Sequence, residues 1–151
     1  MRFSRIEVEN WGPYRGSHQI DISATPSAPL VLIFGENGRG KTSLAKAIKW
    51  CLYESQSEID ALSMANRQMA SLEDEFQVGV KVVFEYERVT SSNTPLPAQT
   101  LELSRTFKVK PDARKQHGIR VEGATEKSLV IDGEPEISAK IDETIERLAP
   151  L

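Results

Sequence analysis

Residues 35–43 of this 151-residue chain read "GENGRGKTS", and this stretch decides how the sequence around it is interpreted. The pattern G-x-x-x-x-G-K-[ST] is met at every position, by Gly35, Gly40, Lys41 and Thr42. Glycines allow successive backbone N–H groups to turn toward phosphate oxygens, and a following helix adds its positive N-terminal end. The stretch therefore predicts a nucleotide site in which Lys41 contacts the β- and γ-phosphates and the Thr42 hydroxyl ligates Mg²⁺.

The sequence on either side of the loop supplies the strand and the helix that such a loop requires. Before it, "PLVLIF" at residues 29–34 is an unbroken apolar run, which predicts a strand buried on both faces of a parallel sheet. After it, apolar residues follow helical spacing, namely Leu44, Ala47, Ile48, Cys51 and Leu52. The alternative is a glycine-rich turn with a chance lysine. Cys51 is interpreted as a small core residue, not a reactive thiol.

Alternating apolar residues predict further strands in the rest of the chain. Strands are expected at residues 3–8, 18–23, 76–87 and 100–110, with the first two antiparallel and the third and fourth forming a hairpin, and further short strands are expected over residues 118–132. A closing helix is expected from the spacing of Ile137, Ile141, Ile145 and Leu148, ending before Pro150.

The composition limits the function classes. A formal net charge of −3 excludes a global basic field of the kind that by itself indicates nucleic-acid binding. The single cysteine cannot form an internal disulfide, and no apolar run approaches the roughly 18 residues of a membrane span. We expect one cytoplasmic domain with an ordinary hydrophobic core and no membrane partner.

The motifs together resemble the N-terminal lobe of the SMC-like ABC ATPases, a group that includes condensin and cohesin heads, RecN and SbcC. The resemblance lies in "ENWGPYRG", "LVLIFGENGRGKTSLAKAIKWCLYE", "LSRTF" and "IERLAP". It implies an α/β P-loop NTPase of ABC type, whose N-terminal lobe packs a mixed or antiparallel β subdomain on the phosphate-loop helix. The implied ATP-contacting residues are Gly35, Asn37, Gly38, Arg39, Gly40, Lys41, Thr42 and Ser43.

Within this group, "ENWGPYRG" and "MANRQMA" look most like the DndD-type ATPases of bacterial DNA phosphorothioate modification and their phage-defence relatives. Many relatives carry arginine where this chain has Gly12. Arg15 is the candidate to reach the nucleotide instead, and the alternative is a surface arginine in a turn. Trp11 and Tyr14 either pack beside the adenine or hold the turn on the sheet.

Hydrolysis by an ABC head also requires a glutamine loop, a Walker B strand and a signature motif from a second head. No LSGGQ-like stretch is present, and "SLVIDGE" at residues 128–134 imitates Walker B but favours a hairpin turn at Asp132-Gly133. We therefore expect no catalytic residue here, and interpret residues 1–151 as a single ATP-binding lobe, a fragment without coiled coil or C-terminal lobe. The resemblance implies ATPase activity for the full-length protein only. The alternative is a nucleotide-dependent regulatory module that never hydrolyses.

The resemblance also implies partners: the C-terminal lobe and a second head in an ATP-sandwich dimer, DNA, and a nuclease or modification enzyme, in DNA repair, DNA modification or anti-phage defence. Residues 105–120 either meet DNA phosphates or form a solvated hairpin. The cations of this stretch are Arg105, Lys108, Lys110, Arg114, Lys115 and Arg120. His18 and His117 are isolated in sequence, so no histidine metal site is predicted.

Overall fold

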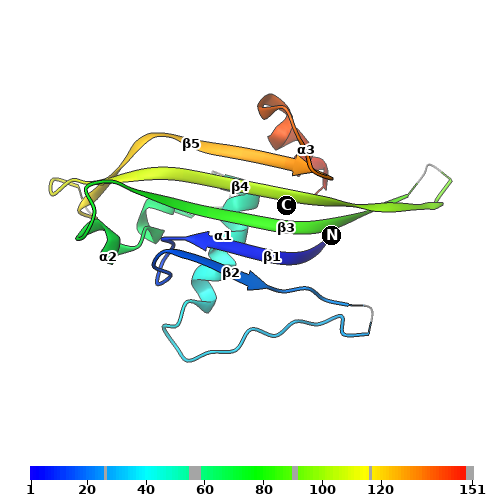
Figure 1. Ribbon diagram of the computed structural model, residues 1–151, viewed down its shortest axis with the longest axis horizontal. Helices are drawn as coiled ribbons and strands as arrows, with labels where there is room; N and C mark the ends of the chain where they lie inside the picture. Colours follow the sequence, from blue (N-terminus) through cyan, green and yellow to red (C-terminus); the bar gives the residue numbers. More distant parts are fainter. Residues whose placement is uncertain (26, 55–58, 90–91, 116, 149–151) are drawn as a thin grey trace.

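One antiparallel sheet forms the body of the molecule in the computed structural model, which describes residues 1–25, 27–54, 59–89, 92–115 and 117–148 (Figure 1). Over these residues six strands lie in the order β2-β1-β3-β4-β5-β6, and every neighbouring pair is antiparallel. The strand predictions outside residues 29–34 are confirmed, except that residues 119–131 form one long strand where short strands were expected. The strands are β1 (Arg2–Glu9), β2 (Ser17–Asp21), β3 (Phe76–Val89), β4 (Pro95–Pro111), β5 (Ile119–Ile131) and β6 (Glu134–Pro135).

Helix α1 (Lys41–Tyr53) packs against one face of this sheet, on the far side in the view of Figure 1. Its buried residues are Leu44, Ala47, Trp50, Cys51 and Leu52. The helix prediction is confirmed, although Ile48 is only half-buried and Trp50, which the periodicity missed, is 3% exposed. The shorter helices are η2 (Ala61–Met64), α2 (Arg67–Ala70), η3 (Ser138–Lys140) and α3 (Ile141–Leu148).

Strict alternation along β3 and β4 decides which face of the sheet meets α1. Successive residues of a strand point to opposite faces, so every second side chain of β3 lies in the core. The buried members are Phe76, Val78, Val80, Val82 and Phe84 on β3, and Leu101, Leu103, Phe107 and Val109 on β4. The opposite face carries mostly polar and charged side chains, with Val83 the buried apolar exception on β3, as expected for an antiparallel sheet with one wet side.

The prediction of a buried strand at residues 29–34 is wrong. The segment has no strand structure, and its side chains are exposed, with Leu30 at 71%, Leu32 at 62% and Phe34 at 84%. A strand needs ladder partners, and no strand among the described residues pairs with this segment, which lies beyond β2 in Figure 1. The side chains of this apolar run would be buried only if another polypeptide packed against them.

The C-terminal prediction is confirmed in part. Ile141 and Ile145 of α3 are buried, and Leu148 is half-buried. Ile137 precedes the helix and is 63% exposed, because α3 begins only at Ile141 and the residues before it form η3. Pro150, the predicted stop signal, lies outside the described residues.

The reactivity of the Cys51 thiol provides a chemical test of how α1 packs on the sheet. Its thiol is fully buried, and burial raises its pKa to about 12 against the opposing effect of the Arg105 guanidinium. Only about one thiol in ten thousand is then ionised at pH 8, so we expect native protein to resist iodoacetamide and guanidinium-unfolded protein to react completely. Mass spectrometry of the single cysteine reads this out. Rapid labelling of the native chain would contradict the packing of α1 on the sheet.

Candidate nucleotide-binding site

The loop at residues 35–40 leads directly into α1, and two of its glycines adopt left-handed conformations. Gly38 has φ of 82° and Gly40 has φ of 97°, a region that costs other residues about 1–2 kcal/mol. Gly40 is the N-cap of α1, and its carbonyl accepts the Leu44 N–H at 2.9 Å. The chain thus turns sharply into a helix whose first N–H groups have no partner within the helix and attract anions.

The Lys41 side chain folds back over this loop. Its Nζ donates to the Gly35 carbonyl at 2.5 Å and to the Glu36 carbonyl at 2.8 Å. The ammonium group therefore lies over the loop entrance, next to the positive end of α1. A cation held by two carbonyl oxygens can exchange them for a stronger, charged acceptor such as a phosphate oxygen.

The rest of the loop is open to solvent. Residues 35–39 and Thr42 are exposed, and Ser43 is half-buried. Glu36 and Arg39 form an ion pair at 3.2 Å, which contributes little stability because both side chains are largely exposed. The structure thus brings the predicted residues into one continuous loop and helix start. Their contacts with ATP, and that of Thr42 with Mg²⁺, stay predictions.

A second element lies against the loop: residues 10–16, which connect β1 to β2 and are called the 10–16 turn below. A Cβ on Gly40 would lie 2.8 Å from Pro13 Cγ and 2.8 Å from Tyr14 Oη. The backbone of Gly40 is therefore in direct contact with this turn, and only glycine fits there. Tyr14 is half-buried beside the loop, and its ring meets His18 edge-on at 5.5 Å.

Trp11 holds the 10–16 turn on helix α1, whereas the sequence left open a place beside the adenine or an anchor on the sheet. Its side chain is fully buried and stacks on Trp50, with ring centroids 5.1 Å apart. Its indole Nε1 donates to the Ser43 carbonyl at 2.8 Å. Buried indole N–H groups normally find such a partner, and here the partner belongs to the first turn of the phosphate-loop helix.

Gly12 departs from the family pattern for a steric reason. Its φ is 55°, and a Cβ there would lie 2.9 Å from Ser43 Oγ and 3.2 Å from Met64 Cε. The arginine of many relatives would not fit this turn as it is packed here. Arg15 is exposed, and its carbonyl accepts a hydrogen bond from His18 Nε2 at 2.8 Å. Contact between Arg15 and a nucleotide stays a prediction.

The basic stretch at residues 105–120 is not a free cationic surface, because Arg105 is 2% exposed in the core. Its guanidinium Nε donates to the Cys51 carbonyl at 2.6 Å, and Nη1 pairs with Glu54 at 2.6 Å. Nη2 lies 3.5 Å from Asp142, which also pairs with Lys127. The hydrogen bond from Lys127 is the main cause that lowers the pKa of Asp142, and Arg105 adds to it.

Other cations of the stretch also have acidic partners. Lys108 and Lys110 pair with Glu75, and Arg120 pairs with Glu122. Arg114, at the β4–β5 tip, lies 3.6 Å from Asp112 and keeps a side chain that is 93% exposed. The described part of the stretch therefore offers a DNA backbone a small cationic tip at most, and the solvated-hairpin interpretation fits it better.

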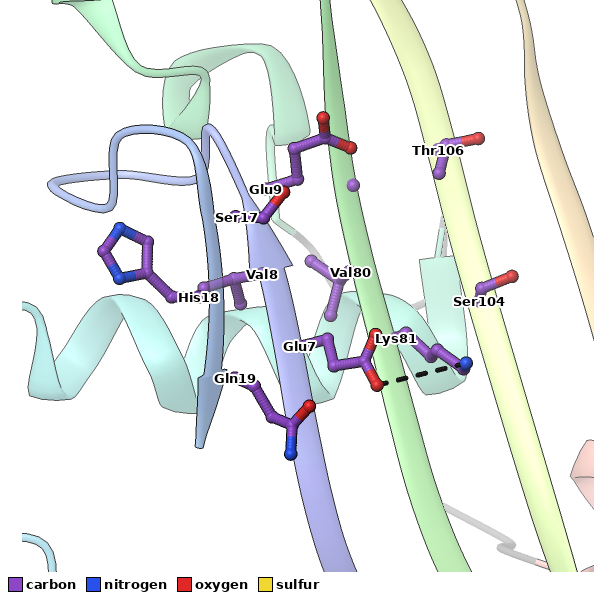
Figure 2. A pocket seen from close by; sticks show the side chains of 11 residues that line it. Glu7, Val8, Glu9, Ser17, His18, Gln19, Val80, Lys81, Ser104 and Thr106 are labelled. Atoms are coloured by element: carbon purple, nitrogen blue, oxygen red, sulfur yellow. Dashed lines mark ion pairs between the residues drawn. The ribbon is translucent and has the colours of Figure 1, made fainter. Parts of the chain in front are cut away.

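One hollow on the described surface lies away from the candidate nucleotide site. It lies on the outer face of the sheet, is lined by β1 to β4, and contains none of residues 35–43 (Figure 2). The Lys81 ammonium in it pairs with Glu102 at 2.8 Å and lies 3.9 Å from Glu7. With its cation neutralised in this way, the hollow does not have the charge that a nucleotide phosphate needs.

The Walker B imitation is a hairpin turn, as predicted. Asp132 and Gly133 have φ of 51° and 88°, the signature of a tight turn between antiparallel strands. The Asp132 carboxylate accepts hydrogen bonds from the Thr100 N–H at 2.8 Å and from Gln99 Nε2 at 3.1 Å. Asp132 therefore closes the β5–β6 turn onto β4.

Metal sites and membrane helices are both absent from the described ranges. These ranges contain no group of three or more His, Cys, Asp and Glu side chains that could hold a metal ion. No helix in the same ranges is long and apolar enough to cross a membrane.

Sequence reasoning missed three buried polar residues, two of them in or beside the 10–16 turn and one at the C-terminal end of α1. Asn10 Nδ2 donates to the Gln77 carbonyl and Asn66 Nδ2 to the Gly12 carbonyl, both at 2.8 Å. The third is Arg105, whose charge indicates a surface position. A usable signal existed for Arg105, because it occupies the inward position of the alternation Leu101, Leu103, Phe107.

Comparison with known proteins places this architecture in a family. A family model described as an AAA domain matches residues 5–149. Arcadin-4 of Pyrobaculum calidifontis is 38% identical over 58 residues, which make up 38% of this chain and 7% of that protein. The SbcC component of the nuclease SbcCD of Treponema pallidum is 40% identical over 53 residues, or 35% of this chain and 5% of that protein. The chain thus spans a small part of these curated relatives.

Among solved structures, one described as "Structural biochemistry of ATP-driven dimerization and DNA stimulated activation of SMC ATPases" shares the fold. Its TM-score is 0.51 at 15% sequence identity, and the match covers 99% of this chain and 82% of that chain. The architecture is therefore that of the N-terminal lobe of an SMC-like ABC ATPase, as the resemblance implied. Because the family model matches nearly its whole length, the chain belongs to this AAA-domain family.

Proposed function

We propose that this chain binds Mg-ATP through residues 35–43 as one half of an SMC-like ABC ATPase head that acts on DNA. The observation that carries the proposal is the position of the Lys41 ammonium over the loop entrance at the start of α1. There the lysine, the glycine backbone and the helix end all favour the same triphosphate. Thr42, on the exposed side of the first turn, would supply the hydroxyl for Mg²⁺.

A second lobe completes the head in this proposal. The exposed apolar side chains of residues 29–34 support it, since a patch of this kind marks a surface that another polypeptide covers. The segment also leads directly into the phosphate loop, so a strand that pairs with it would fix the loop from the other side. The catalytic carboxylate and the signature motif would come from that lobe and from a second head.

The pathway is proposed from the relatives. The matching solved structure concerns ATP-driven dimerization and DNA-stimulated activation of SMC ATPases, and a curated relative is part of the nuclease SbcCD. We propose DNA repair, modification or anti-phage defence as the setting, with DNA and a nuclease or modification enzyme as partners.

Replacing Lys41 by alanine tests the site. We expect the Kd for Mg-ATP to rise roughly 10- to 100-fold, because a hydrogen bond to a charged group contributes about 1.5–3 kcal/mol. Lys46→Ala is the matched control, since Lys46 is an exposed lysine of the same helix, and its Kd should stay within about twofold. Calorimetric titration measures both. ATP binding that is indifferent to Lys41 would overturn the site.

ATPase activity separates the proposed ATPase from a regulatory module. The chain is mixed with a separately expressed C-terminal lobe, and phosphate release is measured with and without DNA. Activity that requires both lobes supports the proposal. If ATP binds but the reconstituted pair stays inert, the chain acts as a nucleotide-dependent regulatory module instead.

A further inference from the structure

The 10–16 turn is held in place by hydrogen bonds from buried side chains and from neighbouring backbone. Asn10 is 5% exposed, and its Oδ1 accepts the Gly16 N–H at 2.8 Å. The Gly12 N–H donates to the Met64 carbonyl at 2.5 Å, while the Gly12 carbonyl accepts Asn66 Nδ2 at 2.8 Å. These hydrogen bonds fix the turn relative to β1 and η2.

From this fixed turn, Trp11 reaches the first turn of α1. Its indole Nε1 bonds to the Ser43 carbonyl, and its ring is held on Trp50, two turns further along the same helix. The contact therefore has two separable parts. The stack holds the middle of the helix, and the hydrogen bond holds its first turn.

The hydrogen bond from the Trp11 indole holds the Ser43–Leu44 peptide unit, which directly follows the phosphate loop in the first turn of α1. The peptide between Ser43 and Leu44 donates its N–H to the Gly40 carbonyl at 2.9 Å, and its C=O accepts the Trp11 indole. Both ends of this peptide plane are thus fixed. The N–H groups of residues 41–43, which precede it and have no partner within the helix, take their direction from the same turn.

We propose that Trp11 is a positioning residue for the phosphate loop: its indole N–H orients the first turn of α1 toward the nucleotide phosphates. The inference rests on the proposed ATP site. It assigns to the 10–16 turn the role of a rigid wall behind the loop, consistent with the contacts of Pro13 and Tyr14 with Gly40. Trp11 itself touches no phosphate in this scheme.

The first experiment needs no nucleotide. Trp11→Phe keeps an aromatic ring on Trp50 but removes the indole donor. We expect hydrogen-exchange protection of the Leu44 amide to fall about fivefold, the worth of one ordinary hydrogen bond. Amides at Trp50 and Cys51 should change less than twofold. Unchanged protection of Leu44 would overturn the proposal even in a chain that binds no ATP.

The second experiment compares ligands. Trp11→Phe should weaken Mg-ATP about fivefold and leave adenosine unchanged, because the oriented groups face phosphate only. The matched control is Trp50→Phe, which alters the stack and retains the Ser43 hydrogen bond, so it should lower the melting temperature and spare the Kd. If both variants change stability and affinity in parallel, the role of Trp11 is structural and the proposal fails.

The two experiments distinguish this inference from the proposed function. Unmodified protein that binds no ATP refutes the ATP site, and the exchange of Leu44 then still decides whether Trp11 orients the helix start. Should Trp11→Phe not fold, the indole ¹⁵N resonance of Trp11 in the unmodified chain serves instead. Addition of Mg-ATP should shift it, and a resonance that does not move under saturating ATP overturns the inference.

Discussion

Replacing Arg105 by alanine will lower the free energy of unfolding by about 3 kcal/mol, near the lower end for breaking a buried ion pair. The guanidinium is 2% exposed and bonds to three groups at once: the Cys51 carbonyl of α1, the carboxylate of Glu54 at the C-cap of α1, and Asp142 of α3. Its loss leaves the Cys51 carbonyl without this donor and removes a cation from the C-terminal end of α1, where cations are favourable. The carboxylates of Glu54 and Asp142 remain in contact with water, so the loss of folding free energy is not larger.

Urea denaturation with circular dichroism measures this effect, which corresponds to a fall of roughly 6–12 °C in melting temperature for a chain of this size. Lys108→Ala is the matched control, because Lys108 lies on the same strand and pairs with Glu75 at the surface. Its change should stay within about 0.5 kcal/mol. Equal effects of the two substitutions would show that Arg105 does not join α1, β4 and α3 as described.

Replacing Gly40 by alanine will weaken Mg-ATP binding roughly 100-fold, the order expected when one or two hydrogen bonds to a charged phosphate, each worth about 1.5–3 kcal/mol, are lost. Gly40 has φ of 97°, and the new Cβ would lie 2.8 Å from Pro13 Cγ, which sits in a rigid ring. Because the 10–16 turn is fixed by its own hydrogen bonds, the phosphate loop must move instead. The displacement falls on the residues that would face the phosphates.

Gly123→Ala is the control that separates the steric clash of the new Cβ in Gly40→Ala from the strain of a left-handed backbone. Gly123 has φ of 79° on β5, and a Cβ there meets nothing within 4 Å. It should lose about 1–2 kcal/mol of stability from strain alone and bind ATP normally. Titration calorimetry and thermal unfolding of both variants decide the matter. Normal ATP binding by Gly40→Ala would mean that the loop does not depend on the 10–16 turn.

Most of the strands, helix α1 and the glycine loop that precedes it follow from local chemistry, and these were predictable. The glycines and Lys41 of residues 35–43 carry their signal within nine positions, and the alternation of residues 76–87 shows which face of β3 is apolar. The turn at Asp132-Gly133 is equally local, because left-handed φ values favour these residue types. The helical spacing around Cys51 also correctly placed this residue in the core.

Residues 29–34 show where local chemistry is insufficient. The apolar run predicts a buried strand, yet burial depends on a partner that the run itself cannot specify, and the described chain leaves it exposed. The same holds for Arg105, whose charge predicts a surface position. Its burial depends on Cys51, Glu54 and Asp142, which lie 37 to 54 residues away in sequence.

The sequence by itself therefore determined the phosphate loop, its helix and the alternating strands, because the pattern of each is carried by residues that are close together in the sequence. Only the tertiary structure decided what lies behind the loop. The contact of Gly40 with the 10–16 turn and the bond from Trp11 to Ser43 join segments about 30 residues apart. They arise from the antiparallel return of β3 beside β1 and from the packing of α1 on that sheet, which no local pattern encodes.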